Sequence, residues 1–372
     1  MKRAAALVRA PRAAARATAI RFRSRSWPDH SRLFVLGDEL GWVLDEEAAY
    51  VSSVARAAGY GLGPAAWARS ARRQVVFHTS HFAALEPVWT RSSHRLGTSY
   101  FHGRPGTPGF PEFDRAYDAL RRDPERLARI HVTHGEMEEL VRSAGVDPQR
   151  VHRIPLGVDL PRFPLADEER RAAARASLAL PDDAFVVGSF QKDGVGLEEG
   201  LEPKLVKGPD VLVEALALVH ERVDRLVVLL TGLARGYVRR GLEERGISHV
   251  HRLLPDRDAL ADAYQALDAY VVASRQEGGP KGVLESLASG VPLVTTRVGQ
   301  AVDLVRDGEN GLLVEVDDAD AISAGLVRIA REPALVSSFR LAGRATAEAT
   351  SEAALVPRWR RLLDDFAERG DG

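Results

Sequence analysis

The chain has 372 residues, of which 45% are hydrophobic and 28% are charged; this composition is typical of a soluble globular protein, and the length allows two domains. It contains no cysteine, which excludes disulfides, thiolate metal sites and a cysteine nucleophile. The formal net charge is −1 at pH 7, and no apolar run approaches the roughly 20 residues that a membrane-spanning helix requires.

The first residues differ from the rest in charge. Residues 1–27 hold eight Lys or Arg and no acidic residue, which leaves −9 for the remainder of the chain. We expect residues 1–30 to form a disordered extension. A basic arm that contacts anionic lipid or nucleic acid is one alternative, and a transit-like peptide is another.

From residue 32 onward, short apolar strands alternate with helical patterns, which predicts α/β domains with parallel sheets. In the first half, strands are expected at Leu33–Leu36, Gln74–His78, Thr98–Phe101, Arg129–Thr133 and Val151–Pro155. The helices between them are expected at Glu46–Ala58, Glu112–Arg122 and Glu136–Ala144. Because its two prolines suit a linker, Leu160–Pro164 is expected to end a first domain at residues 31–165.

The second half repeats the alternation and predicts a domain at residues 166–350. After a helix at Asp167–Leu178, strands are expected at Phe185–Phe190, Arg225–Thr231, Val250–Leu254, Ala269–Ala273, Pro292–Thr295 and Leu312–Glu315. The segment 351–372 contains a last helical pattern, Leu355–Glu368. Two α/β domains joined by a short linker predict a cleft between them, where the carboxyl ends of the strands would meet a ligand.

A strand–turn–helix junction carries the most specific chemistry. Glu277 lies in a turn with Gly278, Gly279 and Pro280, and Glu285 follows on the helix Lys281–Ser289. A helix N-terminus suits a phosphate, and glycines let a ligand approach the backbone closely. Two carboxylates beside such a turn can accept hydrogen bonds from sugar hydroxyls, so the junction fits a sugar diphosphate. The alternative is a solvated loop Glu277 and a surface helix Glu285.

The residues from Glu277 to Glu285, followed by Ser286–Val294, resemble the E-x7-E signature of retaining glycosyltransferases of family 4. The likeness continues through Thr295–Gly299 and Val305–Val314. The chain departs from that family in having Gly279 where an apolar or aromatic residue is usual, which puts the donor sugar pocket in doubt.

This resemblance implies the GT-B fold, in which two Rossmann-like domains with parallel sheets face a central cleft. The first domain would bind the acceptor and the second a nucleotide-diphosphate sugar, while the last helix would cross back to the first domain. In the family, the first glutamate contacts the transferred sugar and the second holds the donor ribose, roles that we carry to Glu277 and Glu285. The resemblance implies front-face transfer without a metal ion.

Further donor-binding residues follow from the same resemblance. The family binds the diphosphate with a Gly-Arg after the first donor-domain strand and a Lys-Gly before the next helix. Lys207-Gly208 fits the second motif, but Ser189 follows Gly188 where the arginine is expected. Lys192 and Lys204, from the long intervening loop, are the candidates for the missing charge.

Three other positions complete the candidate site. Gly232 and Arg235 follow a strand, where Arg235 could reach a phosphate or ribose; an ordinary helix cap with a surface arginine is the alternative.

On the acceptor side, His102 resembles the family's histidine near the transferred sugar, and His78 is a rival at another strand end. Asp256-Arg257-Asp258 and Asp318-Ala319-Asp320 are better explained as helix caps than as metal ligands.

We therefore expect a retaining glycosyltransferase that moves a sugar from a nucleotide-diphosphate donor to a glycan, lipid or small-molecule acceptor, without a cofactor. A non-catalytic sugar-nucleotide-binding or scaffold protein is one alternative, and an epimerase or phosphorylase of the same fold is another. Nucleic acid is not expected as a partner because the body of the chain is acidic. The family suggests a cytoplasmic protein with peripheral contact at the inner membrane face.

Overall fold

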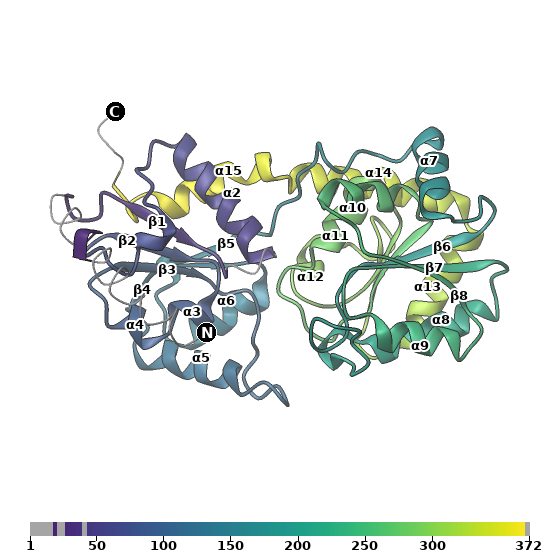
Figure 1. Cartoon of the computed structure of the whole chain (residues 1–372), viewed down its shortest axis with the longest axis horizontal. Helices are drawn as coiled ribbons and strands as arrows, with labels where there is room; N and C mark the ends of the chain where they lie inside the picture. Colours follow the sequence, from purple (N-terminus) through teal and green to yellow (C-terminus); the bar gives the residue numbers. More distant parts are fainter. Residues whose placement is uncertain (1–17, 21–26, 39–42, 369–372) are drawn as a thin grey trace, which may run out of the picture. The chain divides into compact units, whose positions relative to one another are not determined.

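The computed structural model describes residues 18–20, 27–38 and 43–368, which form two compact α/β units (Figure 1). The first unit contains the described residues up to Ile154 and those from Val356 onward, and the second contains Pro155–Leu355. No helix of the described residues is long and apolar enough to cross a membrane.

In the first unit, five parallel strands form one sheet in the order β1-β2-β3-β4-β5. The strands are β1 (Leu33–Leu36), β2 (Val75–His78), β3 (Arg95–Ser99), β4 (Leu127–Val132) and β5 (Val151–Arg153). The helices that accompany them are α2 (Val43–Ala57), α3 (His81–Ala84), α4 (Pro87–Thr90), α5 (Pro111–Arg122), α6 (Gly135–Ser143) and, from Val356 onward, α15 (Glu352–Leu363).

The C-terminal helix α15, yellow in Figure 1, belongs to the core of the first unit through Trp359. The Trp359 ring is buried and meets the rings of Phe77 and His131 edge to face, at centroid distances of 5.9 and 4.5 Å. Arg129 of β4 adds hydrogen bonds to the carbonyls of Leu362 and Asp364. The end of the chain thus covers the first sheet with aromatic surface.

In the second unit, six parallel strands are ordered β11-β10-β9-β6-β7-β8. They are β6 (Phe185–Ser189), β7 (Leu226–Thr231), β8 (Ser248–Arg252), β9 (Ala269–Val272), β10 (Leu293–Thr296) and β11 (Leu312–Val314). The helices are α7 (Glu168–Leu178), α8 (Pro209–His220), α9 (Gly236–Glu243), α10 (Arg257–Gln265), α11 (Lys281–Ser289), α12 (Ala301–Leu304), α13 (Ala319–Arg331) and α14 (Pro333–Ala349).

Both faces of the second sheet are buried. On β9, Tyr270 and Val272 join one hydrophobic cluster, while Ala269 and Val271 join another. Successive side chains of a strand point to opposite faces, and a sheet covered on both sides therefore reads as a continuous apolar run. This is why the central strands could be located from the sequence, and the α/β class with parallel sheets is confirmed.

The domain boundaries differ from the expected ones. The second unit begins at Pro155, and Phe163, which lies in the expected linker, is fully buried against Tyr264. At the other end, Trp27 stacks on Trp67 and packs in the core of the first unit, so the expected extension does not reach residue 30. In both places an aromatic side chain fixes the chain by contacts that local patterns do not reveal. Most of residues 1–30 lie outside the described residues.

Buried histidines, His131 and His78 among them, make the first unit sensitive to acid. His131 Nε2 lies 2.6 Å from the Ile154 carbonyl and Nδ1 lies 2.9 Å from the Ser99 hydroxyl, an arrangement that suits the neutral ring. Burial lowers the pKa of His131 to about 4, and it also lowers the pKa of His78 to about 4. Between pH 6.5 and 4 the unfolded chain therefore binds more protons than the folded one.

We expect the free energy of unfolding to fall as the pH drops from 7 to 5, by about 2 kcal/mol for each of these two histidines. Urea unfolding followed by tryptophan fluorescence at both pH values measures the loss. His131→Gln should remove about 2 kcal/mol of the loss, whereas His220→Gln, at an exposed position on α8, should leave it unchanged. An equal pH dependence in His131→Gln and the parent protein would contradict this assignment.

Candidate functional site

The strand order of the second sheet defines where a ligand should bind. From β6 the chain proceeds to β7 and β8 on one side, then returns to β9 on the other side of β6. In open parallel sheets, ligands bind at the carboxyl ends of the strands where the order reverses. The loops that follow β6 and β9 therefore border the expected site of this unit, and they contain Lys207 and Glu277 respectively.

The structure brings these two predicted residues into contact. Lys207 Nζ lies 2.5 Å from Glu277 Oε1, and the Ser274 hydroxyl donates to the same oxygen at 2.8 Å. Gln191 supports the pair through its side chain. Its Nε2 donates to the Lys207 carbonyl, and its Oε1 lies 3.2 Å from the Ser274 hydroxyl. Both charged side chains keep part of their surface exposed, at 23% for Lys207 and 11% for Glu277. They form a paired cation and carboxylate that a ligand can reach.

Backbone contacts fasten the two loops to each other. The amides of Arg275 and Gln276 both donate to the Val206 carbonyl. Gly208 adopts the left-handed region at φ +60°, and a Cβ there would lie 1.9 Å from the Ala273 carbonyl oxygen. Only glycine lets the loop after β6 pass the end of β9 so closely. The Lys-Gly motif is thus explained by the packing that sets Lys207 beside Glu277.

Glu285 is buried on α11 and both of its oxygens are engaged. Arg257 donates to Oε1 at 2.6 Å and the Tyr264 hydroxyl donates to Oε2 at 3.0 Å. Burial raises the pKa of Tyr264 well above its ordinary value, which keeps the hydroxyl protonated as a donor. The Glu285 side chain is 5% exposed, so the alternative of a solvated surface glutamate is wrong for this residue.

The glycines of the turn have packing roles. A Cβ on Gly279 would lie 2.6 Å from Leu156 Cδ1, so Leu156 occupies the space that a side chain would need. The Gly278 carbonyl accepts a hydrogen bond from the backbone amide of Gln300. Packing against Leu156 therefore requires glycine at this position, and the donor-binding role of Gly279 stays a prediction. Pro280 lies at the N-cap, one residue before the helix.

Arg235 does not lie at an accessible phosphate position. Its guanidinium is fully buried, donates from Nε to Asp193 Oδ1 at 3.0 Å and also bonds the carbonyls of Ser189 and Thr231. The proposed direct contact with a donor is therefore corrected, because every edge of the guanidinium faces protein. Gly232, at the end of β7 with φ +83°, accepts a hydrogen bond from His251 Nε2 through its carbonyl.

The two remaining predicted lysines, Lys192 and Lys204, lie in the same segment after β6 as Lys207. Electrostatic interactions connect Lys204 with Lys207, Glu277 and Lys192. Burial, followed by the charges of Lys207 and Lys192, lowers the pKa of Lys204, while Glu277 opposes the shift. Three lysines in one loop, of which Lys207 contacts Glu277, make this part of the chain attractive to a polyanion such as a diphosphate.

In the first unit, His102 and His78 differ in accessibility. His102 follows β3, is partly exposed, and meets the rings of His81, Phe82 and Phe113 at 5.6 to 6.0 Å. His78 is buried edge-on against Trp89. A ligand can therefore reach His102 more readily than its rival.

Asp256 and Asp318 accept hydrogen bonds from the amides of Ala259 and Ala321, which confirms that they cap α10 and α13. An aspartate at this position satisfies an amide that would otherwise lack a partner within the helix.

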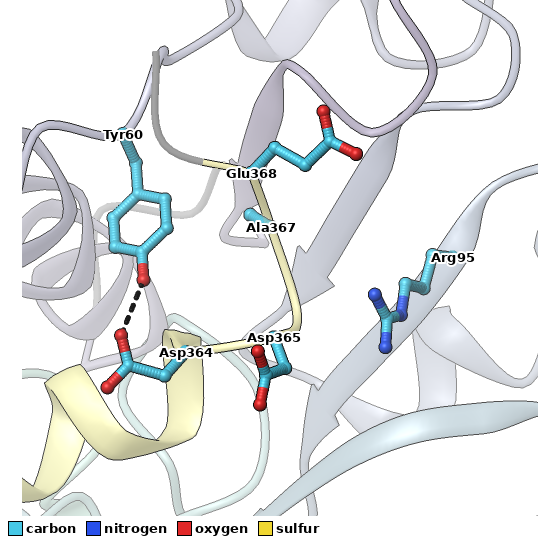
Figure 2. Close-up of a pocket in the computed structure, with 6 residues that line it drawn as sticks. All are labelled: Tyr60, Arg95, Asp364, Asp365, Ala367 and Glu368. Atoms are coloured by element: carbon cyan, nitrogen blue, oxygen red, sulfur yellow. Dashed lines mark hydrogen bonds between the residues drawn. The ribbon is translucent and has the colours of Figure 1, made fainter. Parts of the chain in front are cut away.

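Figure 2 shows a polar pocket of the first unit, with a volume of about 400 Å³. It is lined by Tyr60, Arg95, Asp364, Asp365, Ala367 and Glu368. The Tyr60 hydroxyl donates to Asp364 Oδ1 at 3.0 Å. Arg95 is the first residue of β3, so the pocket borders the amino edge of the sheet, whereas ligands of parallel sheets bind at the carboxyl edge. It contains none of the predicted site residues.

Several supporting residues escaped the sequence analysis. Ser274, Gln191 and Asp193 lie in loops without a local pattern, and Gln191 and Asp193 have partners that are distant in the chain. Tyr264, which bonds Glu285, was not singled out from the sequence. Their roles depend on which loops the sheet brings together.

Comparison with known proteins finds that part of the chain is similar to glycosyltransferases. Residues 200–332, within the second unit, match the family described as glycosyl transferases group 1. The chain is 33% identical over 273 residues to D-inositol 3-phosphate glycosyltransferase 2 of Catenulispora acidiphila, with 63% of this chain and 60% of that protein covered. It is 38% identical over 234 residues to D-inositol 3-phosphate glycosyltransferase of Actinosynnema mirum, with coverages of 58% and 52%. The matches thus span little more than half of these relatives.

Among solved structures, Anabaena HepE in complex with UDP-glucose has a TM-score of 0.72 at 14% identity, covering 90% of this chain and 99% of that one. Sucrose-phosphate synthase from Thermosynechococcus elongatus has a TM-score of 0.66 at 19% identity, with coverages of 93% and 90%. At these identities the likeness concerns the fold. The expected GT-B class, with two Rossmann-like α/β units, is confirmed.

The buried partners of Glu285 yield a prediction for stability. Arg257→Met should lower the free energy of unfolding by about 2–3 kcal/mol, because a buried carboxylate loses its cation. Chemical denaturation measures the change. Arg162→Met is the matched control, since Arg162 pairs with the exposed Asp258 and should cost less than about 1 kcal/mol. Equal losses in the two variants would show that Arg257 and Glu285 behave as a surface pair.

Proposed function

We propose that this protein is a retaining glycosyltransferase that takes a sugar from a nucleotide-diphosphate donor. The observation that carries the proposal is the contact between Lys207 and Glu277 at the carboxyl ends of β6 and β9, with Glu285 held on the adjacent helix. The match of residues 200–332 to glycosyl transferases group 1 and the fold shared with a UDP-glucose complex support the same activity.

The residues suggest how the donor is held. The diphosphate would lie over the ends of β6 and β9, where Lys207 can donate to a phosphate oxygen while it keeps its contact with Glu277. Lys192 and Lys204 add positive charge beside it, and the N-terminus of α11 contributes its partial positive charge. Glu277 would accept hydrogen bonds from the sugar hydroxyls, and Glu285 would hold the ribose. Gly232 and Gly278 supply backbone at the rim of the site.

The chemistry would be a front-face transfer that needs no protein nucleophile. The bond between the anomeric carbon and the diphosphate oxygen breaks while the acceptor hydroxyl oxygen bonds to that carbon from the same face. The acceptor proton passes to the departing phosphate oxygen, so charge and atoms balance. The lysines stabilise the negative charge that develops on the leaving group, and we propose that this electrostatic task is met without a metal ion. His102 would contact the sugar or the acceptor.

The acceptor belongs to the proposal as well. A glycan, a lipid or a small molecule all fit an activity of this type. The names of the sequence relatives add a specific candidate class, the inositol phosphates, to the acceptors that merit testing.

Donor binding tests the proposal first. Titration calorimetry with UDP-, GDP- and ADP-sugars should show binding of one nucleotide class. Lys207→Ala should weaken it roughly 10- to 100-fold, because a charge-assisted hydrogen bond to phosphate is lost. Glu285→Gln should also weaken it. Arg328→Ala, which breaks an exposed ion pair on α13, is the control and should bind as the parent does.

Transfer assays with the bound donor then separate the alternatives. Formation of a product that retains the anomeric configuration is the expected result. Donor binding without transfer to any acceptor would favour a scaffold protein. Conversion of the donor without an acceptor would favour an epimerase, and sugar release driven by inorganic phosphate would favour a phosphorylase. A folded protein that binds no nucleotide sugar would overturn the proposal.

A further inference from the structure

Lysine is scarce in this chain and concentrated at one place. Only five of the 51 Lys and Arg residues are lysines. Apart from Lys2, they are Lys192, Lys204, Lys207 and Lys281, and all four lie in the segments that follow β6 and β9. Arginine serves almost everywhere else as the cation. A lysine ammonium is a compact, mobile point charge, so its restriction to these loops indicates a task for which the chain does not use arginine.

The segment between Lys192 and Lys204 is an ordered hairpin. Gly194 and Pro203 form an antiparallel bridge, and the Lys204 amide donates to the Asp193 carbonyl at 2.8 Å. The Lys207 amide in turn donates to the Lys204 carbonyl at 2.8 Å. The backbone of Lys204 is thereby fixed between Asp193 and Lys207.

The tip of the hairpin docks on the start of α9. The carbonyls of Glu198, Glu199 and Gly200 accept hydrogen bonds from the amides of Ala234, Gly236 and Tyr237 respectively. The amides of Gly236 and Tyr237 are the first two of α9 and have no partners within the helix itself. The hairpin therefore satisfies the N-terminus of α9.

At the base of the hairpin, Asp193 and Arg235 form an ion pair whose side chains are both 0% exposed. Arg235 also donates to the Ser189 carbonyl at the end of β6 and to the Thr231 carbonyl at the end of β7. Desolvation raises the pKa of Asp193, and Arg235 opposes that shift. Burying two charges contributes little net stability compared with apolar residues, whereas it can specify one geometry. The pair ties the hairpin to the ends of two neighbouring strands.

We propose that the Asp193–Arg235 pair is a positioning device that holds the 193–204 hairpin so that Lys204 stands beside Lys207 as a second ammonium for a diphosphate. This inference rests on the proposed function for its ligand. Lys207 and Lys192 oppose the charge of Lys204 electrostatically, and a bound diphosphate would relieve this repulsion. A diphosphate offers two phosphoryl groups to the two ammonium groups, whereas a monophosphate offers one. Asp193 thus acts through Lys204 and does not touch the ligand.

Calorimetric titration of the full chain with UDP, GDP, ADP, the corresponding monophosphates and inorganic pyrophosphate tests this inference. Lys204→Ala and Asp193→Asn should each weaken diphosphate binding about 10-fold, which corresponds to the loss of one charge-assisted contact. Monophosphate binding should change much less. The double variant should bind no more weakly than the weaker single variant, because both changes remove the same contact. Lys204→Arg, which keeps the positive charge, should lose less affinity than Lys204→Ala.

Asp268→Asn is the matched control. Asp268 also forms an ion pair with a buried arginine, Arg175. Asp268 immediately precedes β9, however, so this pair lies at the amino edge of the sheet. This variant should lose stability and keep its diphosphate affinity. If Asp193→Asn does not fold, Arg235→Lys takes its place: it keeps the charge but cannot bond Asp193 and both carbonyls together, and should also weaken binding.

The outcomes separate this inference from the proposed function. Parent-like diphosphate binding in Asp193→Asn, or a double variant whose loss is the product of the single losses, would overturn the inference and leave the transferase proposal intact. Binding of pyrophosphate that depends on Asp193 and Lys204, in a protein that transfers no sugar, would support the inference and overturn the function. A parent protein that binds neither diphosphates nor pyrophosphate would overturn both.

Discussion

The pairing of β6 with β9 is the constraint on which the candidate site depends. Val187 and Gly188 pair with Ala269 and Tyr270, although the two strands are far apart in sequence. Both strands run in the same direction, so the loops that follow them leave the sheet at the same edge. The contact between Lys207 and Glu277 follows from this topology. Lys207 and Glu277 meet because their loops leave two adjacent parallel strands at the same edge of the sheet.

Two ion pairs with buried carboxylates hold residues near that edge in place. Arg257 holds Glu285, and Arg235 holds Asp193, in each case across a loop or between helices. Such groups are expensive to bury, and they hold a single geometry best when every donor has an acceptor. Arg235 and Arg257 thus hold carboxylates within the second unit, while Lys207 keeps partial access to solvent.

The sequence located the strands best where the sheet is covered on both faces, and its errors have physical causes. The strand expected at Thr98–Phe101 is observed as β3 (Arg95–Ser99). Tyr100 is buried by stacking on His81 at 3.8 Å, so its apolar character reflects side-chain packing beyond the end of the strand. Trp27 and Phe163 likewise belong to cores that no local pattern indicates, and they move both domain boundaries.

The sequence by itself determined the strand–turn–helix junction from Ala269 to Ser289, the Lys207-Gly208 motif and the alternation that predicts parallel sheets, because each depends on residues close in the chain. Tertiary structure decided the rest. Local patterns could not predict the buried ion pair of Arg235, because its partner Asp193 lies 42 positions away in the sequence. Gly279 is required because Leu156 fills the neighbouring space. A local pattern specifies the element that carries a side chain, whereas the surroundings of that side chain are set by segments that only folding brings together.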